Sequence, residues 1–584
     1  MRSFFKIFFA SCLSFFVFAL VVFFILMGVI FNAASPDKPR ISDNAVLVLD
    51  LTKQYKEQRD ESAIGAFTGN TDNNVPGLYD VVRMIAYAKS DNSVKGIYIK
   101  CEENFNGFAA SEELRLALQD FKKSRKFVIA YGDVISQKAY YVANVADKIY
   151  CNPKGVVDWR GMASTLFFLK GTLERLEIQP QIFYAGKFKS ATEPLREYQM
   201  TEANRLQTSI YLNDLYGNIL SSAAARTKSD TAALHALANT GAIQTANDAV
   251  IYNLVDAVKY DDEVKSEIIK KLGIKETEKI NYVSLAKYAK AVNFARSGGS
   301  RIAIIYAEGE IMDGKGEEGE IGSDAFRNII RKARLDESIK AIVFRVNSPG
   351  GSSLASEEIW REISLAKKAK PVVVSFGDVA ASGGYYISCN ADSIFAQPNT
   401  ITGSIGVFGI IPNMKEFFNK KLGVTFDQVK TGPYADMLTV NRPLNITEKQ
   451  FIQNSIDTIY NDFKSRVSEG RKLSMAAVDS IAQGRVWTGQ RALQVGLVDR
   501  LGSINDAVAC ASRMAKLKDY SLKEYPEKKS FIEKLVNDYT NEVKVKAIKE
   551  EIGEEQYSIL KQLKMVKKMI AIPQARLPFD ITVQ

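Results

Sequence analysis

Apolar residues along the chain alternate between short continuous runs and longer stretches with helical spacing. The runs have the length of strands, and amphipathic helical patterns begin near Ser111 and Ser356. Short apolar runs separated by helices are typical of βαβ units, whose parallel strands are buried on both faces. The pattern therefore predicts an α/β fold with mostly parallel strands, the clearest of which are expected at residues 96–100, 127–131, 341–346 and 372–376.

One apolar stretch at the N-terminus stands apart from this alternation. Residues 7–31 carry no charged side chain, and about 20 apolar residues in a helix are enough to cross the hydrocarbon layer. We therefore expect an uncleaved single-pass membrane anchor within residues 1–43. A cleaved signal peptide is the alternative, but its apolar region is usually about 7 to 15 residues long, and Asn32-Ala33-Ala34 fits a cleavage site poorly. The flanking charges, Arg2 and Lys6 on one side and Lys38 and Arg40 on the other, do not decide the orientation.

The organisation of the rest of the chain is revealed by an internal repeat. The segment GDVISQKAYYVANVADKIYCNP begins at Gly132, and GDVAASGGYYISCNADSIFAQP begins 245 positions later at Gly377. Several other matches keep the same offset without a gap. A period this long indicates a duplicated domain, because solenoid repeats are roughly 20 to 50 residues long. We expect one copy at 44–297, a second copy at 298–527, and a charged helical tail at 528–584.

Composition narrows the functional classes. The 584 residues include 77 basic and 67 acidic side chains, which give a formal net charge of +10. The two signs are interleaved, and no basic cluster alternates with aromatic residues, so nucleic acid is not an expected partner. A mild basic excess suits an anionic membrane surface. The five cysteines have no metal-ligand spacing, so neither a cysteine-bound metal site nor a disulfide framework is expected.

The two copies differ at positions that carry chemistry. The second copy has NSPGG at Asn347–Gly351 and DVAASGG at Asp378–Gly384, each at a predicted strand end. Glycines in such turns let backbone amides point at a bound oxyanion, and Ser382 at a helix start is well placed as a nucleophile. Either motif alone also fits an ordinary glycine-rich turn with an N-cap serine. In the first copy these residues are replaced, with Phe105 and Asn106 opposite Gly350 and Gly351, and Gln137 opposite Ser382.

A serine nucleophile needs a base, and the usual partner is scarce in this chain. The one histidine, His235, lies in an Ala/Leu-rich helical pattern outside every motif. Lysine serves as a base when burial lowers its pKa. The segment AGKFKSATEP of the first copy stands out, since the second copy has TGPYADMLTV there, with Ala435 opposite Lys189. Spacing alone does not separate Lys189 from Lys187, and each copy would supply half of a dyad.

Taken together, NSPGGS, DVAASGGYYI, NTITGSIGVFG and GKFKSATEP resemble the signal peptide peptidase A (protease IV) family in its long, duplicated form. The resemblance implies two tandem crotonase/Clp-protease-like domains and a serine protease with a Ser/Lys dyad. It implies Ser382 as nucleophile and Lys189 as general base, since only Lys189 precedes the family-like Ser-Ala-x-Glu-Pro pattern. It further implies that Ser404 orients the lysine, and that the oxyanion donors are the amides of Gly383 and of Gly350 or Gly351.

The same resemblance implies a cellular setting. Members of that family degrade signal-peptide remnants and other exposed peptides on the outer side of the inner membrane, and they assemble into rings or domes. We therefore expect a homo-oligomer, in particular a homotetramer, in the bacterial inner membrane with its catalytic domains on the periplasmic side. Two alternatives from other classes remain at this stage. A crotonase-like acyl-CoA enzyme would leave the anchor and the Ser/Lys pair unexplained. A noncatalytic membrane scaffold would leave the complementary chemistry of the two copies unexplained.

Overall fold

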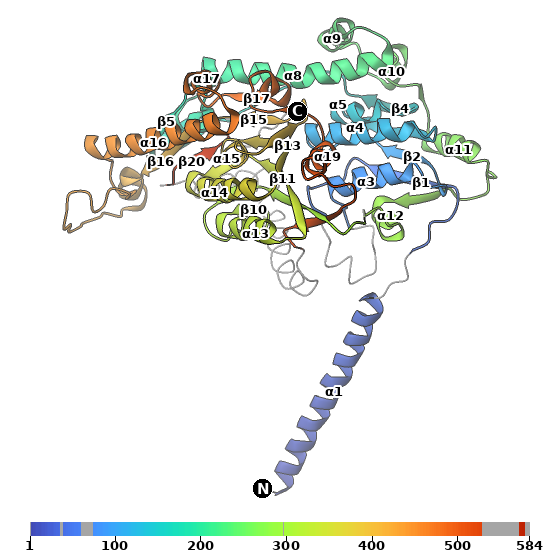
Figure 1. Cartoon of the computed structure of the whole chain (residues 1–584), viewed down its shortest axis with the longest axis horizontal. Coiled ribbons are helices and arrows are strands. Elements are labelled where there is room, and N and C mark those ends of the chain that lie inside the picture. The colour runs from blue at the N-terminus through green and yellow to red at the C-terminus, as the bar shows by residue number, and fades with distance from the viewer. Residues whose placement is uncertain (1, 35–38, 60–73, 296, 528–571, 578–584) are drawn as a thin grey trace.

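The computed structural model describes residues 2–34, 39–59, 74–295, 297–527 and 572–577 (Figure 1). Within these residues, each half of the sequence builds a sheet of its own, and a third sheet joins the halves. The strands of the first sheet lie within residues 45–284 and those of the second within 301–525. The domain limits expected from the sequence stay predictions, and residues 528–571 of the expected helical tail lie outside the described residues.

The first sheet has six strands, and every neighbouring pair is parallel. Buried aliphatic side chains on its strands, such as Leu47 and Ile97, pack against Leu114 and Leu118 of a covering helix. The strands in spatial order are β6 (Ala257–Val258), β4 (Lys148–Val157), β3 (Phe127–Ile135), β2 (Val94–Lys100), β1 (Ala45–Asp50) and β7 (Asn281–Ser284), and the helices that connect its central strands are α3 (Leu78–Ala88), α4 (Phe108–Lys122) and α5 (Gln137–Ala143).

The second sheet repeats this plan. Its central strands are parallel, and only the short β17 runs antiparallel to its neighbour. The main strands in spatial order are β17 (Val486–Thr488), β15 (Ile401–Gly403), β13 (Val372–Ala381), β11 (Ile339–Ser348), β8 (Arg301–Glu308) and β19 (Ser521–Tyr525), with β14 (Ser393–Ala396) and β18 (Arg500–Leu501) beside them. The corresponding helices are α13 (Ser323–Leu335), α14 (Ser353–Ala369) and α15 (Gly383–Tyr386).

The predicted elements are found in both copies. The four strands expected from apolar runs lie within β2, β3, β11 and β13, and the helices expected near Ser111 and Ser356 are α4 and α14. The fold is therefore α/β with two tandem domains, as the repeat predicted. Further helices follow the sheets: α6 (Lys170–Arg175), α7 (Glu193–Arg196), α8 (Glu202–Thr227), α9 (Thr231–Thr240), α10 (Ala246–Ile251), α11 (Asp261–Leu272), α12 (Leu285–Ala291), α16 (Ile446–Arg471), α17 (Met475–Ile481), α18 (Gly489–Gln494) and α19 (Ile504–Met514).

A third sheet, which the sequence did not predict, combines strands from distant parts of the chain. Strand β5 of the first copy pairs antiparallel with β16 of the second copy along its whole length, from Ala185 opposite Val407 to Gln179 opposite Asn413. This pairing carries the segment after β5 into the second copy. The spatial order is β10 (Glu320–Gly322), β9 (Glu310–Met312), β12 (Gly350–Ser352), β20 (Gln574–Arg576), β16 (Val407–Asn413) and β5 (Gln179–Ala185).

The two copies also meet through buried charges. Arg345 of β11 is fully buried, and its guanidinium donates to Glu57 and Glu113 of the first copy at 2.8 Å each. Asp378 of β13 accepts hydrogen bonds from the amides of Ala109 and Ala110 at 2.8 and 3.0 Å. These amides belong to the first turn of α4, where acceptors are stabilising because the amides lack helical partners. Polar contacts from the second copy thus fix the orientation of the first.

Long helices cover the junction. Helix α8 runs along the upper edge of the molecule in Figure 1, over elements of both copies. Its Asp214 accepts from Thr488 at 2.8 Å and pairs with Arg491 at 2.6 Å, so a helix of the first copy is tied to the second.

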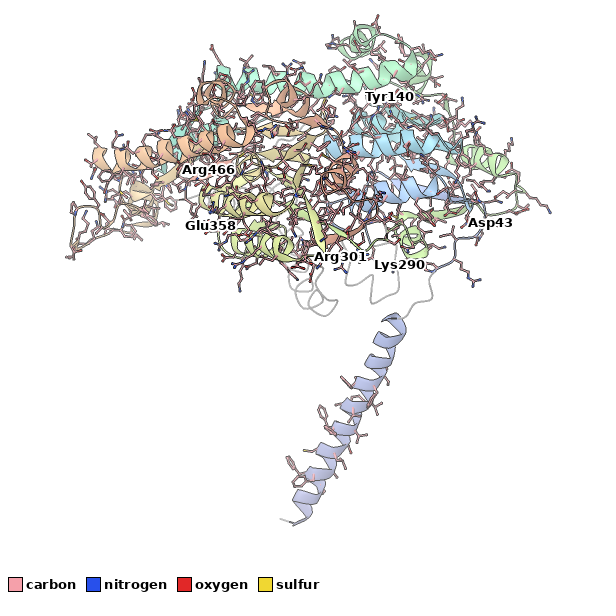
Figure 2. The ribbon with its side chains drawn as sticks, viewed as in Figure 1. Asp43, Tyr140, Lys290, Arg301, Glu358 and Arg466 are labelled. Carbon is pink, nitrogen blue, oxygen red and sulfur yellow. The ribbon has the colours of Figure 1, made fainter. Side chains whose placement is uncertain are left out.

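Helix α1 (Arg2–Ala34) is the one described element outside this body. Figure 2 shows it standing away from the rest of the molecule, with its drawn side chains meeting no other element. Its segment Ile7–Ile25 has a mean hydropathy of 2.7, and none of it is buried. A helix with these properties has the length and composition of a membrane span. It agrees with the expected N-terminal membrane anchor.

Candidate active site

Ser382 occupies a tight turn between β13 and α15. Its backbone has φ 55° and ψ −114°, a conformation that costs a residue with a side chain about 1–3 kcal/mol. Hydrogen bonds hold this turn, because the Ser382 amide donates to the Gly403 carbonyl and the Tyr386 amide donates to the Ser382 carbonyl, both at 2.8 Å. The Ser382 hydroxyl does not cap the helix. The alternative of an N-cap serine is therefore not what the structure contains, and the hydroxyl points to other partners.

The main partner of this hydroxyl is Lys189. The Lys189 Nζ lies 2.8 Å from Ser382 Oγ, and it also donates to the carbonyl and the hydroxyl of Ser404 at 3.0 and 3.1 Å. The lysine follows β5, so the pairing of β5 with β16 places this residue of the first copy within the second copy. All three side chains are at most 1% exposed. The structure thus brings together the three side chains that the sequence singled out from two different copies.

Burial is the cause of a strong perturbation of this lysine. It holds the pKa of Lys189 well below its usual value of 10.5, because the ammonium loses its hydration without gaining a charged partner. The nearby carboxylate of Glu193 is engaged elsewhere, accepting from Thr201 Oγ1 at 2.6 Å and from Asn204 Nδ2 at 2.9 Å. Lys187 is exposed, with its Nζ 5.9 Å from the centre of the Phe188 ring. Of the two candidate lysines, only Lys189 faces Ser382.

The turn that carries Ser404 is fixed by backbone contacts. Ser404 follows β15 with a positive φ of 49°, and its amide donates to the Arg485 carbonyl at 2.6 Å. Space around the lysine is limited by two glycines, since a Cβ atom on Gly406 would lie 3.1 Å from Lys189 Cδ, and one on Gly484 would lie 2.6 Å from the Lys189 amide nitrogen. Side chains at these two positions would displace the lysine from the serine.

Gly350 lies against Gly383, the residue that follows Ser382. Gly350 has φ 98°, which glycine adopts at little cost, and a Cβ atom there would lie 2.6 Å from the Gly383 amide nitrogen. The Gly350 amide donates to Ser348 Oγ at 3.1 Å. Gly351 is the ladder partner of Ala575, the central residue of β20. The backbone of the NSPGG turn therefore lies against the first residue of α15.

The equivalent positions in the first copy have only structural contacts. Gln137 begins α5, and its side-chain amide exchanges hydrogen bonds with the Gly161 backbone at 3.2 and 3.4 Å. Asn106 is buried and accepts from the Tyr55 amide at 2.8 Å. His235 lies exposed on α9 with its ring against Tyr216, away from these residues. The chain thus has one candidate site among its described residues, built from both copies.

Comparison with known proteins identifies the family to which this chain belongs. Residues 120–275 and 364–518 both match the model of Peptidase family S49. This chain belongs to peptidase family S49. It is 39% identical to Protease 4 of Salmonella typhi over 80% of this chain and 76% of that protein, and 31% identical to the chloroplastic serine protease SPPA of Arabidopsis thaliana over 82% and 70%. A solved ClpP1 mutant from Listeria monocytogenes matches 35% of this chain and 94% of its own, with a TM-score of 0.24 and 16% identity. The family member described here is a serine protease.

Sequence reasoning missed two parts of the site. It did not anticipate that β5 pairs with β16, and it wrongly placed residues 573–577 in a charged helical tail. Gln574–Arg576 instead form a buried strand beside the site glycines. The first is hidden because β5, QPQIFYA, has neither a continuous apolar run nor a strict alternation. The second is hidden because the segment follows a long charged stretch, and a strand of three residues leaves no periodic signal.

Proposed function

We propose that this serine protease is a membrane-bound endopeptidase whose catalytic groups are Ser382 and Lys189. The observation that carries the proposal is the 2.8 Å contact between Lys189 Nζ and Ser382 Oγ inside a buried space. A nucleophile and a base in direct hydrogen-bond contact meet the geometric requirement for nucleophilic catalysis. Burial supplies the second requirement, since an uncharged amine accepts a proton and an ammonium does not. The family membership favours the protease over an acyl-CoA enzyme or a noncatalytic scaffold.

The reaction begins when neutral Lys189 takes the hydroxyl proton of Ser382 as its Oγ attacks a peptide carbonyl carbon. The carbonyl oxygen becomes an oxyanion, which the backbone amides of Gly383 and Gly351 stabilise. We favour Gly351 over Gly350 as the second donor, because the Gly350 amide already donates to Ser348 Oγ. The peptide C–N bond then breaks, and Lys189 transfers the proton to the leaving amine. Water, activated by Lys189, hydrolyses the acyl-enzyme and restores Ser382.

Ser404 has a positioning role in this scheme. Its hydroxyl and carbonyl oxygens both contact the Lys189 Nζ, so they restrict the rotation of the amine and keep one lone pair directed at the serine. Their dipoles also stabilise the ammonium that forms during proton transfer. No metal or cofactor has a part in these steps.

The proposal is tested by hydrolysis of unstructured peptides with variants of the full chain. Ser382→Ala and Lys189→Ala are each expected to lower kcat/KM by a factor of at least about 10²–10⁴. A factor of this size is the usual contribution of a positioned base, and removal of the nucleophile is expected to lower kcat/KM at least as much. Lys187→Ala is the matched control, because this lysine is two residues away but exposed, and it is expected to keep full activity. Retention of activity by Lys189→Ala, or its loss in Lys187→Ala, would overturn the assignment.

The membrane setting and the substrates belong to the same proposal. Helix α1 supports a single-pass anchor, and the resemblance to signal peptide peptidase A supports the bacterial inner membrane, with the catalytic domains on its periplasmic side and signal-peptide remnants as substrates. A reporter fused to the C-terminus distinguishes the two orientations. Activity of an alkaline phosphatase fusion supports the periplasmic side, and fluorescence of a cytoplasmically folding reporter alone would contradict it.

We also propose a homo-oligomer, with a tetramer as the expected form. The oligomer is supported by a group of large apolar side chains that are exposed on one segment of the second copy, between β16 and the first turns of α16. Apolar residues concentrated in this way mark an interface. Sedimentation of the detergent-solubilised chain measures the mass, and a monomer at micromolar concentration would contradict the assembly. The residues are Leu422, Val424, Phe426, Val429, Tyr434, Leu438, Ile446 and Phe451.

A further inference from the structure

Lys189 is the central residue of an inverse γ-turn. Its backbone has φ −74° and ψ 79°, and the Ser190 amide donates to the Phe188 carbonyl at 2.8 Å across it. The Lys189 amine lies at the end of a long side chain, so a small rotation of the turn displaces the amine by a larger distance. The contact between Lys189 Nζ and Ser382 Oγ therefore depends on what holds the two ends of this turn.

The side chain of Gln207 contacts both ends of the turn. Its Nε2 donates to the Phe188 carbonyl at 3.1 Å and to Ser190 Oγ at 3.0 Å. The residue lies near the beginning of α8 and is only 3% exposed, so little water competes for these hydrogen bonds. Gln207 thus braces the residues on either side of Lys189.

The oxygen of the same carboxamide contacts the second copy. Gln207 Oε1 accepts from the Val486 amide of β17 at 3.2 Å, and α8 passes over this strand (Figure 1). Val486 pairs with Gly403 in the ladder between β17 and β15, and the Gly403 carbonyl accepts from the Ser382 amide at 2.8 Å. One planar group therefore links the turn of the base to the strand pair that holds the nucleophile.

The position of this side chain requires a carboxamide. The Phe188 carbonyl can only accept and the Val486 amide can only donate, so the group between them must donate on one side and accept on the other. Asn204 contributes to its orientation, since Asn204 Oδ1 lies 3.3 Å from Gln207 Nε2, and Asn204 Nδ2 donates to Glu193 at 2.9 Å. A methionine side chain would form neither of the two backbone contacts.

We propose that Gln207 is a positioning residue of the dyad. By fixing the turn around Lys189 relative to β17, its carboxamide keeps the Lys189 amine within reach of Ser382. The proposal rests on the function proposed above, since it takes Lys189 as the base. Because the carboxamide is buried and engaged on both sides, Gln207 is not expected to contact a substrate, and its role is expected to show in kcat rather than in KM.

The size of the effect follows from the geometry that proton transfer needs. A misplacement of reacting groups by about 1 Å lowers the rate of the chemical step by about 10²-fold. Gln207→Met keeps most of the length and volume of the side chain but removes its hydrogen bonds to the turn and to β17. We therefore expect kcat to fall by about 10- to 100-fold, with KM changed by less than about twofold.

The test measures peptide hydrolysis and fluorophosphonate labelling in the same variants of the full chain. The end point of labelling counts the folded sites, and its rate reports how strongly the base activates Ser382. In Gln207→Met we expect the parental end point and a labelling rate about 10 to 100 times lower. A lower end point with a parental rate at the remaining sites would assign Gln207 a purely structural role and overturn the proposal.

Gln137→Met is the matched control. Gln137 is also buried, and its carboxamide also exchanges hydrogen bonds with the backbone, but at the equivalent strand end of the first copy. Both variants lose a buried carboxamide, and only Gln207 braces the turn of Lys189. We expect the parental labelling rate and kcat in Gln137→Met. A loss as large as that of Gln207→Met would show that the effect is not specific to the turn, and would overturn the assignment.

A double-mutant cycle with Lys189→Ala shows whether Gln207 acts through the lysine. Once the amine is absent there is nothing to position, so Gln207→Met is expected to leave the residual labelling rate of Lys189→Ala unchanged. A further loss by the same factor would mean that Gln207 acts on Ser382 by another route, which contradicts a role in positioning the base.

The same measurements separate this proposal from the function on which it rests. If Lys189→Ala is labelled as fast as the parent chain, the proposed function fails. If Lys189→Ala is labelled slowly and Gln207→Met is labelled at the parental rate, the proposed function stands and the positioning role of Gln207 is refuted.

Discussion

Replacement of Arg345 by Met is expected to weaken the junction on which the split site depends. The guanidinium of Arg345 pairs with Glu57 and Glu113 at 2.8 Å, and its Nη1 also donates to Ser375 Oγ and to the Phe376 carbonyl at 2.8 Å. Methionine fills much of the volume but leaves two buried carboxylates without a counter-charge. Breaking a buried pair in this way costs about 3–5 kcal/mol. We expect a loss of that size in the free energy of unfolding.

Urea denaturation measures this loss. The slope is about 1–3 kcal/mol per molar urea for small proteins and increases with size, so for a chain this long the midpoint is expected to fall by up to about 1.5 M. Activity is expected to fall together with the unfolding transition, because the lysine and the serine come from different copies. Arg331→Met is the matched control, as this arginine is exposed on α13, and its effect is expected to stay within about 0.5 kcal/mol. A loss below about 1 kcal/mol in Arg345→Met would refute the reasoning.

The loss is also expected to depend on pH. Burial raises the pKa of Glu113 from 4.5 to about 7, and Arg345 opposes this rise. Removing the arginine therefore raises the pKa further. A carboxyl with a raised folded pKa contributes stability that is complete below about 4.5 and is lost as pH rises through the folded pKa. The destabilisation by Arg345→Met should then be larger at pH 8 than at pH 5, and the reverse order would contradict the account.

Three further predictions concern the active site and the anchor. The kcat/KM for a small peptide ester is expected to rise with pH through an ionisation well below 10.5. This ionisation is expected to disappear in Lys189→Ala, and His235→Ala is expected to leave the pH profile unchanged. Activity that is flat from acidic pH upward would contradict a lysine base. Ser404→Ala is expected to lower kcat/KM about tenfold, because one hydrogen bond to the Lys189 amine is lost and the contact with the Ser404 carbonyl remains. An unchanged kcat/KM would contradict a positioning role of Ser404. Deletion of residues 1–34 is expected to give a soluble enzyme with unchanged kcat, and a folded but inactive product would assign α1 a part in catalysis.

The sequence predicted the features that depend on local pattern. Strands β2 and β11 contain the short apolar runs IYI and AIVF, and the turn at Ser382 needs the small residues that flank it, so both are visible in the residues themselves. Duplication made the prediction stronger, because Gln137 and Ser382 could be compared in one chain. The pairing of Lys189 with Ser382 was reached through the resemblance to a family, since spacing alone left Lys187 open.

What the sequence did not predict depends on contacts between distant segments. The pairing of β5 with β16 joins residues more than 200 positions apart. The cost of burying the Arg345 charge is compensated by ion pairs with Glu57 and Glu113 of the other copy. Neither has a periodic signature, because each is defined by what lies opposite in space. The same holds for β20, whose three residues are recognisable as a strand only when β12 and β16 are beside them.

The central claim is that a buried, neutral Lys189 activates Ser382, and covalent labelling tests it most directly. The measurement is the second-order rate constant for modification by a fluorophosphonate probe, with the modified residue located by peptide mass spectrometry, in the parent chain and in Lys189→Ala. We expect the probe on Ser382 in the parent, and a rate at least about 100-fold lower in the variant while its circular dichroism is unchanged. Equal rates in the two proteins, or modification of a residue other than Ser382, would contradict the account.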